Sequence, residues 1–235
     1  MLRIAIVLGL AANVAYGQQP GVPVGVHDYV VHGVYEGEEM PGWDAQSVIA
    51  DSLIAGTHNV HMAFNSRRDG AQWKFSYSSL WRTGGLGSFD AVWDGVTPDG
   101  PGSCSALVRG DTVTVNGRRQ VFESVVPAPL VPEFALGPVI ASLPLEAGAV
   151  LRLRPFRCSL SDGSLRLNSL NASVSAAEHP RGNRSGAEPA WHIRGDAAFP
   201  YEVVVSRIDG LVLREVIPQG SVGIEVREYA GSRSP

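Results

Sequence analysis

Residues 72–94 read QWKFSYSSLWRTGGLGSFDAVWD, and this stretch decides the fold. Large apolar residues alternate with polar ones on both sides of a glycine-rich segment at residues 83–87. Two arms of period two around such a turn predict a β-hairpin. With 83–87 as the loop, the facing pairs are Trp81 with Phe89, Ser79 with Ala91, and Tyr77 with Trp93. Every aromatic residue then lies on one face of the hairpin, and a slip of one residue would destroy that arrangement.

This aromatic row is the first candidate site. As a functional feature, it would line the concave side of a curved sheet and hold an acyl chain or another apolar ligand, because ligand pockets are mostly apolar. As a structural feature, it would be core packing, since cross-strand aromatic pairs stabilise any sheet. The candidate ligand-lining residues are Trp73, Phe75, Tyr77, Trp81, Phe89 and Trp93.

The rest of the chain supplies more strands. Two tight-turn signals, Asn116-Gly117 and Asp209-Gly210, separate apolar runs. The expected strands cover 106–108, 112–115, 149–156, 165–170, 191–194, 201–205, 211–216 and a closing strand at 222–227. About nine to eleven strands joined mostly by short turns predict an antiparallel sheet with strong twist.

Helical patterns are few. Apolar residues at helical spacing predict a short helix over 44–53, with Asp44 as its cap and Gly56 beyond its end. A second short helix is expected within 132–143, interrupted near Gly137-Pro138, and 178–188 is expected to be an exposed loop. The predicted fold is therefore α+β and mostly β: one strongly curved antiparallel sheet, half-barrel or barrel-like, with one or two short helices.

The N-terminus indicates export. Residues 1–17 combine Arg3, an apolar run and a small-residue cleavage site at Ala15-Tyr16-Gly17, which is typical of a signal peptide. The apolar run is shorter than the ~20 residues of a membrane span. The expected organisation is a signal peptide at 1–17, a flexible lead-in and first strand at 18–42, one curved-sheet domain at 43–230 and a tail at 231–235. The expected compartment is the periplasm or outer membrane of a Gram-negative-type bacterium, with full secretion as the alternative.

Composition narrows the class of partner. With 19 basic and 23 acidic residues the formal net charge is −4, which argues against nucleic acid and anionic lipid surfaces as partners. Two cysteines, Cys104 and Cys158, suggest a structural disulfide in an exported protein. Spacing alone leaves two separate buried thiols as the alternative.

No catalytic or metal motif stands out. The sequence contains no G-x-S-x-G elbow, and a strand would send His58 and His61 to opposite faces. His27 and His32 have no better ligand pattern around them. We therefore predict no catalytic residues, no metal and no cofactor. Arg109-Gly110-Asp111 is interpreted as a hairpin turn, and Arg152, Arg154 and Arg166 as either a basic patch or a solvated face.

The segment from Pro132 to the end carries a family resemblance. Its features are Leu143-Pro144-Leu145-Glu146-Ala147-Gly148, the strand at 150–156, Trp191, and the hairpin formed by 201–205 and 211–214 around Asp209-Gly210. In these it resembles a bacterial family of uncharacterised exported proteins, which is similar in turn to the half-barrel carriers of periplasmic lipoproteins. The resemblance covers about half the chain and implies the fold; no functional residue carries over. This chain departs from the family in one respect: many members are lipid-anchored, whereas no cysteine for a lipid anchor follows the expected leader.

Three hypotheses of function follow. The first is a non-enzymatic exported protein that binds a lipid, a lipidated protein or another apolar ligand within the curve of the sheet. The second is an envelope assembly or interaction protein with a filled core and no small ligand. The third is a hydrolase whose site is assembled only in the fold.

Overall fold

The computed structural model describes residues 24–35, 38–51, 57–68, 71–82, 85–97, 100–121, 128–160, 162–182, 186–219 and 223–233; between residues 40 and 88 only the backbone is described. The first eight strands are β1 (Gly25–Tyr35), β2 (Glu38–Asp51), β3 (Thr57–Arg68), β4 (Ala71–Arg82), β5 (Gly85–Thr97), β6 (Gly100–Arg109), β7 (Thr112–Val115) and β8 (Arg118–Val121). Next come β9 (Leu130–Pro132), the 3₁₀ helix η1 (Glu133–Ala135) and the helix α1 (Leu136–Ala141). The chain continues with β10 (Val150–Cys158), β11 (Leu165–Leu167), β12 (Leu170–Pro180), β13 (Ala187–Gly195), β14 (Glu202–Ser206), β15 (Val212–Gln219) and β16 (Gly223–Arg233).

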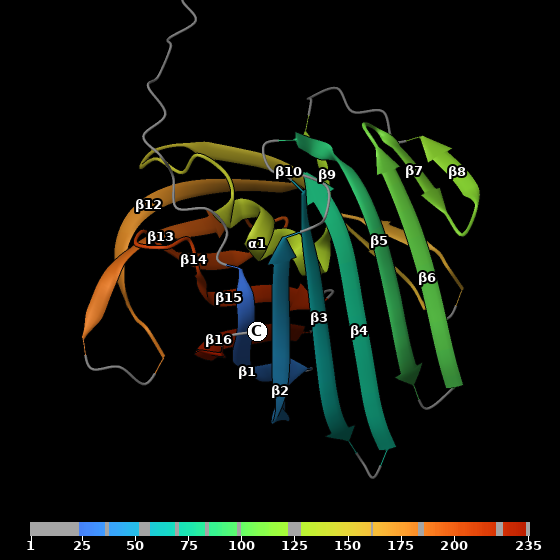
Figure 1. Cartoon of the computed structure of the whole chain (residues 1–235), viewed down its shortest axis with the longest axis horizontal. Helices are drawn as coiled ribbons and strands as arrows, with labels where there is room; N and C mark the ends of the chain where they lie inside the picture. Colours follow the sequence, from blue (N-terminus) through green and yellow to red (C-terminus); the bar gives the residue numbers. More distant parts are fainter. Residues whose placement is uncertain are drawn as a thin grey trace, which may run out of the picture.

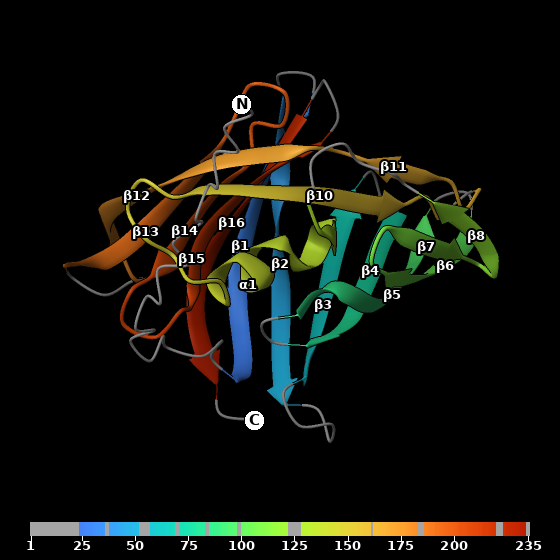
Figure 2. The same ribbon diagram turned by 90° about the horizontal axis from the view of Figure 1, so that it is seen from above.

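Sixteen strands form one sheet that curves around α1 without closing its ladder (Figures 1 and 2). The order runs β10-β12-β13-β14-β15-β16-β1-β2-β3-β4-β5-β6-β7-β8, with β9 and β11 also paired to β10. β11 and β12 pair with β10 in a single register that is interrupted only opposite Arg154 and Pro155, and Pro155 has no N–H to donate. The predicted fold class, a mostly β chain with one curved antiparallel sheet, is confirmed, although the strands are more numerous than expected.

The predicted register of the central hairpin is correct. In β4 and β5, Tyr77 pairs with Trp93, Ser79 with Ala91, and Trp81 with Phe89. The turn is shorter than expected, because β5 already begins at Gly85 and the register shifts after Trp81.

The helix predicted over 44–53 is wrong, because residues 44–51 belong to β2. The adjacent pair Val48-Ile49 fits either a helix or a strand when it is read alone. In the fold, this segment pairs with β1 on one side and β3 on the other. A helix here would leave backbone groups of both neighbouring strands unpaired, so the tertiary pairing overrides the local pattern.

The second expected helix is present as η1 followed by α1, and it lies inside the curve of the sheet (Figure 2). All nine residues of the two segments are buried. β9 lies against β5, and α1 lies against β15. The exposed loop expected at 178–188 is shorter than predicted, because residues 178–180 belong to β12 and residues 187–188 to β13, with Pro180 paired to Ala187.

Burial alternates along the strands and defines the inner face of the sheet. In β1, His27, Tyr29 and Val31 are buried while Val30 and His32 are exposed. In β5, Phe89, Ala91 and Trp93 are buried in the same way. The register carries this inner face across β2, β3 and β4, because residues that pair directly across antiparallel strands share one face.

The two ends of the curved sheet meet along a seam between β6–β7 and β10. A disulfide joins Cys104 of β6 to Cys158 of β10, with 6.2 Å between their Cα atoms. Arg154 of β10 forms an ion pair with Asp111 in the β6–β7 turn. A Cβ at Gly102 would lie 2.6 Å from the backbone oxygen of Leu160, so β6 and the turn after β10 approach closely here. Covalent and side-chain contacts thus close the curve at this seam, where the described residues form no ladder between β6–β7 and β10.

The sheet extends beyond the limits suggested by the sequence. β2 crosses the expected boundary at 42/43, and β16 continues to Arg233, within the expected tail. The predicted signal peptide at 1–17 lies outside the described residues. Among the described residues, no helix has the length and apolar character needed to cross a membrane.

Candidate functional site

Two residues of the predicted aromatic row, Phe89 and Trp93, lie in β5, where their side chains are described. Phe89 and Trp93 are fully or almost fully buried. Trp93 packs edge-on against Phe134 of η1 and Phe156 of β10, with ring centroids 5.4 and 5.7 Å apart. Trp93 is therefore part of the packed core at this end of the row.

The other four residues of the row occupy β4. In the register, Tyr77 and Trp81 pair with Trp93 and Phe89, so they share the inner face with them. Trp73 and Phe75 lie on the same face of β4 by alternation. The side chains of all four are outside the described part of the structure.

The inner face is largely apolar across the neighbouring strands, with His58 opposite Trp81 and Ser47 opposite Met62 as polar positions. On β3, Met62 pairs with Tyr77, Phe64 with Phe75, and Val60 with Ser79. On β2, Ile49 pairs with Val60 and Ala45 with Phe64. The backbone register therefore brings together an inner surface of aromatic and aliphatic positions over three adjacent strands, of which the sequence analysis had recognised only the β4 part.

A buried polar cluster lies on the opposite half of the inner face, beneath α1. Glu215 of β15 accepts hydrogen bonds from the Tyr201 hydroxyl at 2.6 Å and from the backbone N–H of Gly137 at 3.0 Å. Its second oxygen accepts a hydrogen bond from Arg227 at 3.1 Å, and Arg227 also donates to Glu225 at 2.6 Å. Burial raises the pKa of Glu215, while the positive charge of Arg227 opposes that rise. Glu215 thus links the first turn of α1 to the inner face of the sheet.

Glu133, the first residue of η1, is a second buried carboxylate on the inner side. Its Oε2 lies 3.7 Å from Nε of Arg157. Within the described residues, that oxygen has no hydrogen-bond partner. Burial raises the pKa of Glu133, and the charges of Arg157, Arg166 and Arg227 lower it by less. The carboxyl therefore keeps its proton to a higher pH than an exposed glutamate does.

The sequence contains a signal for this cluster, although no candidate site is predicted there. The alternation of apolar Val222, Ile224 and Val226 with other residues predicts a closing strand over 222–227. In β16 the polar parity faces inward: Arg227 is 4% exposed, whereas Ile224 is 40% exposed. Charged residues of opposite sign at inner positions of paired strands, here Glu215 and Arg227, are directly opposite in the register and could have been read as a buried ion pair.

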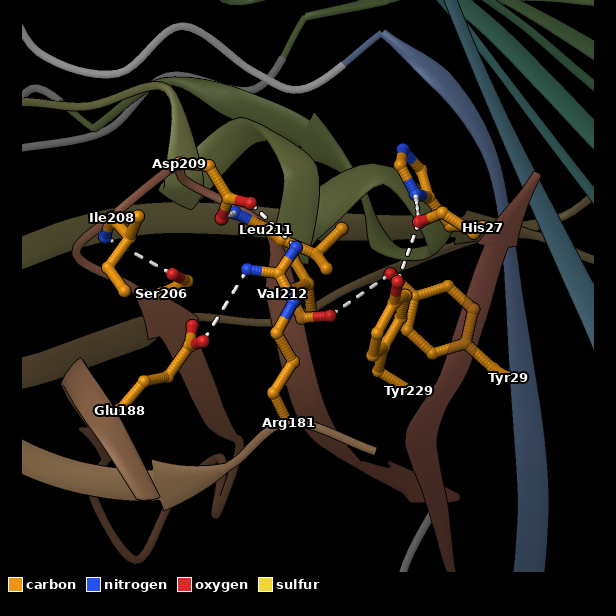
Figure 3. Close-up of polar contacts among 11 residues, drawn as sticks. His27, Tyr29, Arg181, Glu188, Ser206, Ile208, Asp209, Leu211, Val212 and Tyr229 are labelled. Atoms are coloured by element: carbon orange, nitrogen blue, oxygen red, sulfur yellow. Dashed lines mark hydrogen bonds and ion pairs between the residues drawn. The ribbon is translucent and has the colours of Figure 1, made fainter. Parts of the chain in front are cut away.

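A histidine–serine contact lies at the β1–β16 pairing (Figure 3). Nδ1 of buried His27 lies 2.9 Å from Oγ of Ser232, and the Tyr229 hydroxyl lies 2.7 Å from the same oxygen. The distance is that of a nucleophile and its base. However, His27 and Ser232 are direct partners in the register, so strand pairing alone brings them together. Tyr29 completes this corner by donating to the backbone oxygen of Val212.

Arg181 links two turns in the same region (Figure 3). Its guanidinium donates to Asp209 at 2.6 Å and lies 3.5 Å from Glu188. It also lies over the ring of Tyr229, 5.7 Å from the centroid. These contacts tie the turn after β12 to the turn between β14 and β15, which is a structural role.

The remaining candidates, the histidines and the Arg-Gly-Asp segment, lie in different parts of the structure. Among the described residues, no group of three metal-ligating side chains occurs. His32 is exposed, and the side chains of His58 and His61 lie outside the described part. Gly110 and Asp111 form the predicted hairpin turn between β6 and β7, and Arg109 is the last residue of β6, paired with Thr112.

The three arginines considered as a basic patch do not act together. Arg154 is buried and donates to the backbone oxygen of Ala128. Arg152 and Arg166 are exposed.

Comparisons with known proteins place the chain in no family. No family model matches it, and no curated protein matches its sequence. Its structure is similar to the crystal structure of a DUF1089 family protein from Pseudomonas aeruginosa, with 14% identity and a TM-score of 0.42. That match covers 92% of this chain and 97% of the other. A likeness of this degree carries no function over to the present chain.

Proposed function

We propose that this chain is an exported, non-enzymatic protein that holds an apolar ligand, such as the acyl chain of a lipid or lipidated protein, on the inner face of its curved sheet. The proposed position is the part of that face formed by β2, β3 and β4. The observation that carries the proposal is the register of these strands, which gathers aromatic and aliphatic residues on one concave side.

The placement of the helical layer supports this position. η1, β9 and β10 cover the inner face where Trp93 packs against Phe134 and Phe156. In Figure 1, the lower parts of β3, β4 and β5 run past this layer and past α1. An apolar ligand there would gain about 25 cal/mol of free energy for each Å² of apolar surface that it removes from water. This gain is the usual driving force for binding in apolar pockets.

The disulfide supports export in a similar way. Disulfides form and persist in oxidising compartments such as the bacterial periplasm. The Cys104–Cys158 bond at the seam is what an exported protein of this kind would contain.

An interaction protein with a filled core is the second candidate, and one observation favours it. Trp93 is 1% exposed and fully surrounded at its end of the aromatic row. If the same packing continued along β4, the aromatic row would serve stability alone, and binding would fall to the outer face or the loops.

A binding experiment separates the two candidates. The chain, purified without detergent, is titrated with the uncharged apolar dye Nile red while dye fluorescence is followed. The test variant is Tyr77→Asn on the inner face, and the matched control is Ser78→Asn at the next residue, on the outer face of β4. We expect saturable binding that the inner variant weakens by about tenfold, a loss of about 1.4 kcal/mol, and that the outer variant leaves unchanged.

Thermal unfolding of both variants shows whether each of them is still folded. Dye binding that is equal in Tyr77→Asn and Ser78→Asn, with both variants folded, would overturn the proposal in favour of the interaction protein. Lipid extraction of the chain from its own exported compartment, followed by mass spectrometry, identifies the natural ligand.

A further inference from the structure

A serine and a histidine from opposite ends of the chain meet where β1 pairs with β16. Oγ of Ser232 lies 2.9 Å from Nδ1 of His27 and 2.7 Å from the hydroxyl oxygen of Tyr229 (Figure 3). His27 is 3% exposed, whereas Ser232 is exposed. The hydroxyl of Ser232 can therefore be reached by another molecule, while the imidazole beside it is sheltered from water.

Direct pairing of a serine with a histidine does not by itself join the hydroxyl to the ring. In β12 and β13, Ser175 is likewise the direct partner of His192. There the serine hydroxyl donates to the backbone oxygen of His192 at 3.2 Å. The contact of Ser232 with the ring of His27 is thus a feature beyond the register, and Ser175 provides a matched comparison.

Tyr229 holds the hydroxyl of Ser232 from a second side. The ring of Tyr229 packs edge-on against Tyr29, with ring centroids 6.1 Å apart, and the guanidinium of Arg181 lies 5.7 Å from its centroid. When Ser232 donates its proton to Nδ1 of His27, Tyr229 can donate to the same Oγ. The serine oxygen is then oriented by two neighbours, one of which can accept its proton.

The pair lies in one row with the proposed apolar surface. Beginning at His27, direct partners cross the sheet from β1 to β5 through Ser47, Met62, Tyr77 and Trp93. Neighbouring strands lie about 4.8 Å apart, so the backbone of Met62 is about 10 Å from that of His27 along the row. An acyl chain that lies along this row can present its carbonyl end to Ser232.

We propose that Ser232 is a nucleophile that accepts the acyl group of an ester or thioester bound on the inner face, with His27 as its base. Oγ of Ser232 forms a bond to the acyl carbon, and the bond from that carbon to the leaving oxygen or sulfur breaks. The proton of Oγ passes to Nδ1 of His27 and then to the leaving alcohol or thiol. The inference rests on the proposed function, because it makes the ligand of the same face a covalently held one.

The test uses two activated esters, p-nitrophenyl octanoate and p-nitrophenyl acetate, with the chain purified without detergent. Absorbance follows the release of p-nitrophenolate, and intact mass with peptide mapping locates the acyl group. We expect one acyl group per chain, on Ser232. Relative to the rate of each ester with free imidazole, octanoate should react about tenfold faster than acetate, as burial of about two methylene groups would give.

Variants assign the reaction to the two residues. Ser232→Ala changes an exposed side chain and should abolish the adduct while leaving Nile red binding unchanged. Ser175→Ala is the matched control and should react like the wild type. His27→Gln should slow acylation by about a hundredfold, the contribution of a general base. If His27→Gln unfolds the chain, Ser232→Ala still decides the question.

Each contrary result overturns a different statement. An equal adduct in Ser232→Ala and the wild type, or no adduct with Nile red binding intact, would overturn the acyl site and leave the proposed function standing. Equal relative rates for octanoate and acetate would overturn the placement of the acyl chain along the row. Release of p-nitrophenolate far beyond one equivalent would instead overturn the non-enzymatic part of the proposed function. Loss of saturable Nile red binding by the wild type would overturn the apolar ligand itself.

Discussion

Glu133 shows how a single buried carboxyl makes stability depend on pH. Its folded pKa is raised above the ordinary value of 4.5, with burial as the main cause. The folded chain then holds this proton more tightly than the unfolded chain does. Stability from this group is greatest below pH 4.5 and is lost as the pH rises through the raised folded pKa.

Glu133→Gln removes this dependence. At neutral pH we expect a higher melting temperature for the variant than for the wild type, because the amide has no proton to lose. The gap should close as the pH is lowered towards 4.5. The exposed Glu146→Gln serves as control, and a pH-dependent gap of the same size in that variant would contradict the assignment to Glu133.

Gly137 is a residue where the absence of a side chain matters. A Cβ there would lie 2.8 Å from Oε1 of Glu215, the atom that accepts the Gly137 N–H. We expect Gly137→Ala to break this hydrogen bond and to lower the free energy of unfolding by about 1–3 kcal/mol in denaturant titrations. Gly231→Ala is the control, since a Cβ at Gly231 has no atom within 4 Å; a matching loss there would refute the steric explanation.

Among the elements, β2 and β4 show what a sequence pattern reveals and what it conceals. The aromatic residues of β4 and β5 share one parity on both arms, so one register alone keeps them together, and that register was predictable. In β2, Val48 and Ile49 are neighbours and fit two periodicities. Its conformation depends on pairing with β1 and β3, which no local pattern of residues 44–53 reveals.

Arg181 allows a prediction about how two turns are joined. Its side chain is 18% exposed and donates to Asp209. We expect Arg181→Ala to reduce the free energy of unfolding by about 2 kcal/mol, as for a hydrogen bond to a charged group. Arg194→Ala, whose side chain is 66% exposed beside Glu202, should cost less than about 0.5 kcal/mol. Equal losses in chemical unfolding would show that Arg181 does not link the turns.

For the molecule as a whole, the seam is the feature that the sequence revealed least. Cys104 and Cys158 were recognisable as a candidate pair, but Arg154 with Asp111 and Gly102 with Leu160 were not. These contacts arise only when the whole sheet has curved, so they depend on the summed twist of all its strands. Glu215 and Arg227 differ in this respect, because they are direct partners in the pairing of the consecutive strands β15 and β16 and do not depend on the curvature of the whole sheet.

The disulfide should contribute strongly to overall stability. It closes a segment with a sequence separation of 54, for which the chain-entropy estimate is about 4 kcal/mol. We expect the double variant Cys104→Ala and Cys158→Ala to lose about 2–5 kcal/mol of unfolding free energy in guanidinium titrations. An unchanged transition midpoint would mean that the side-chain contacts hold the seam without it.

The position of β1 between β2 and β16 has a consequence for how the chain reaches its fold. Val26, near the start of the described chain, pairs with Val48 and with Arg233, near its end. The centre of the sheet is therefore completed only when the last strand arrives, and the loop that must close spans almost the entire protein. Such distant pairings slow the search for the native state, so we expect refolding over about milliseconds to seconds rather than microseconds. A chain lacking β16 would leave an unpaired edge in mid-sheet, open to pairing with another molecule.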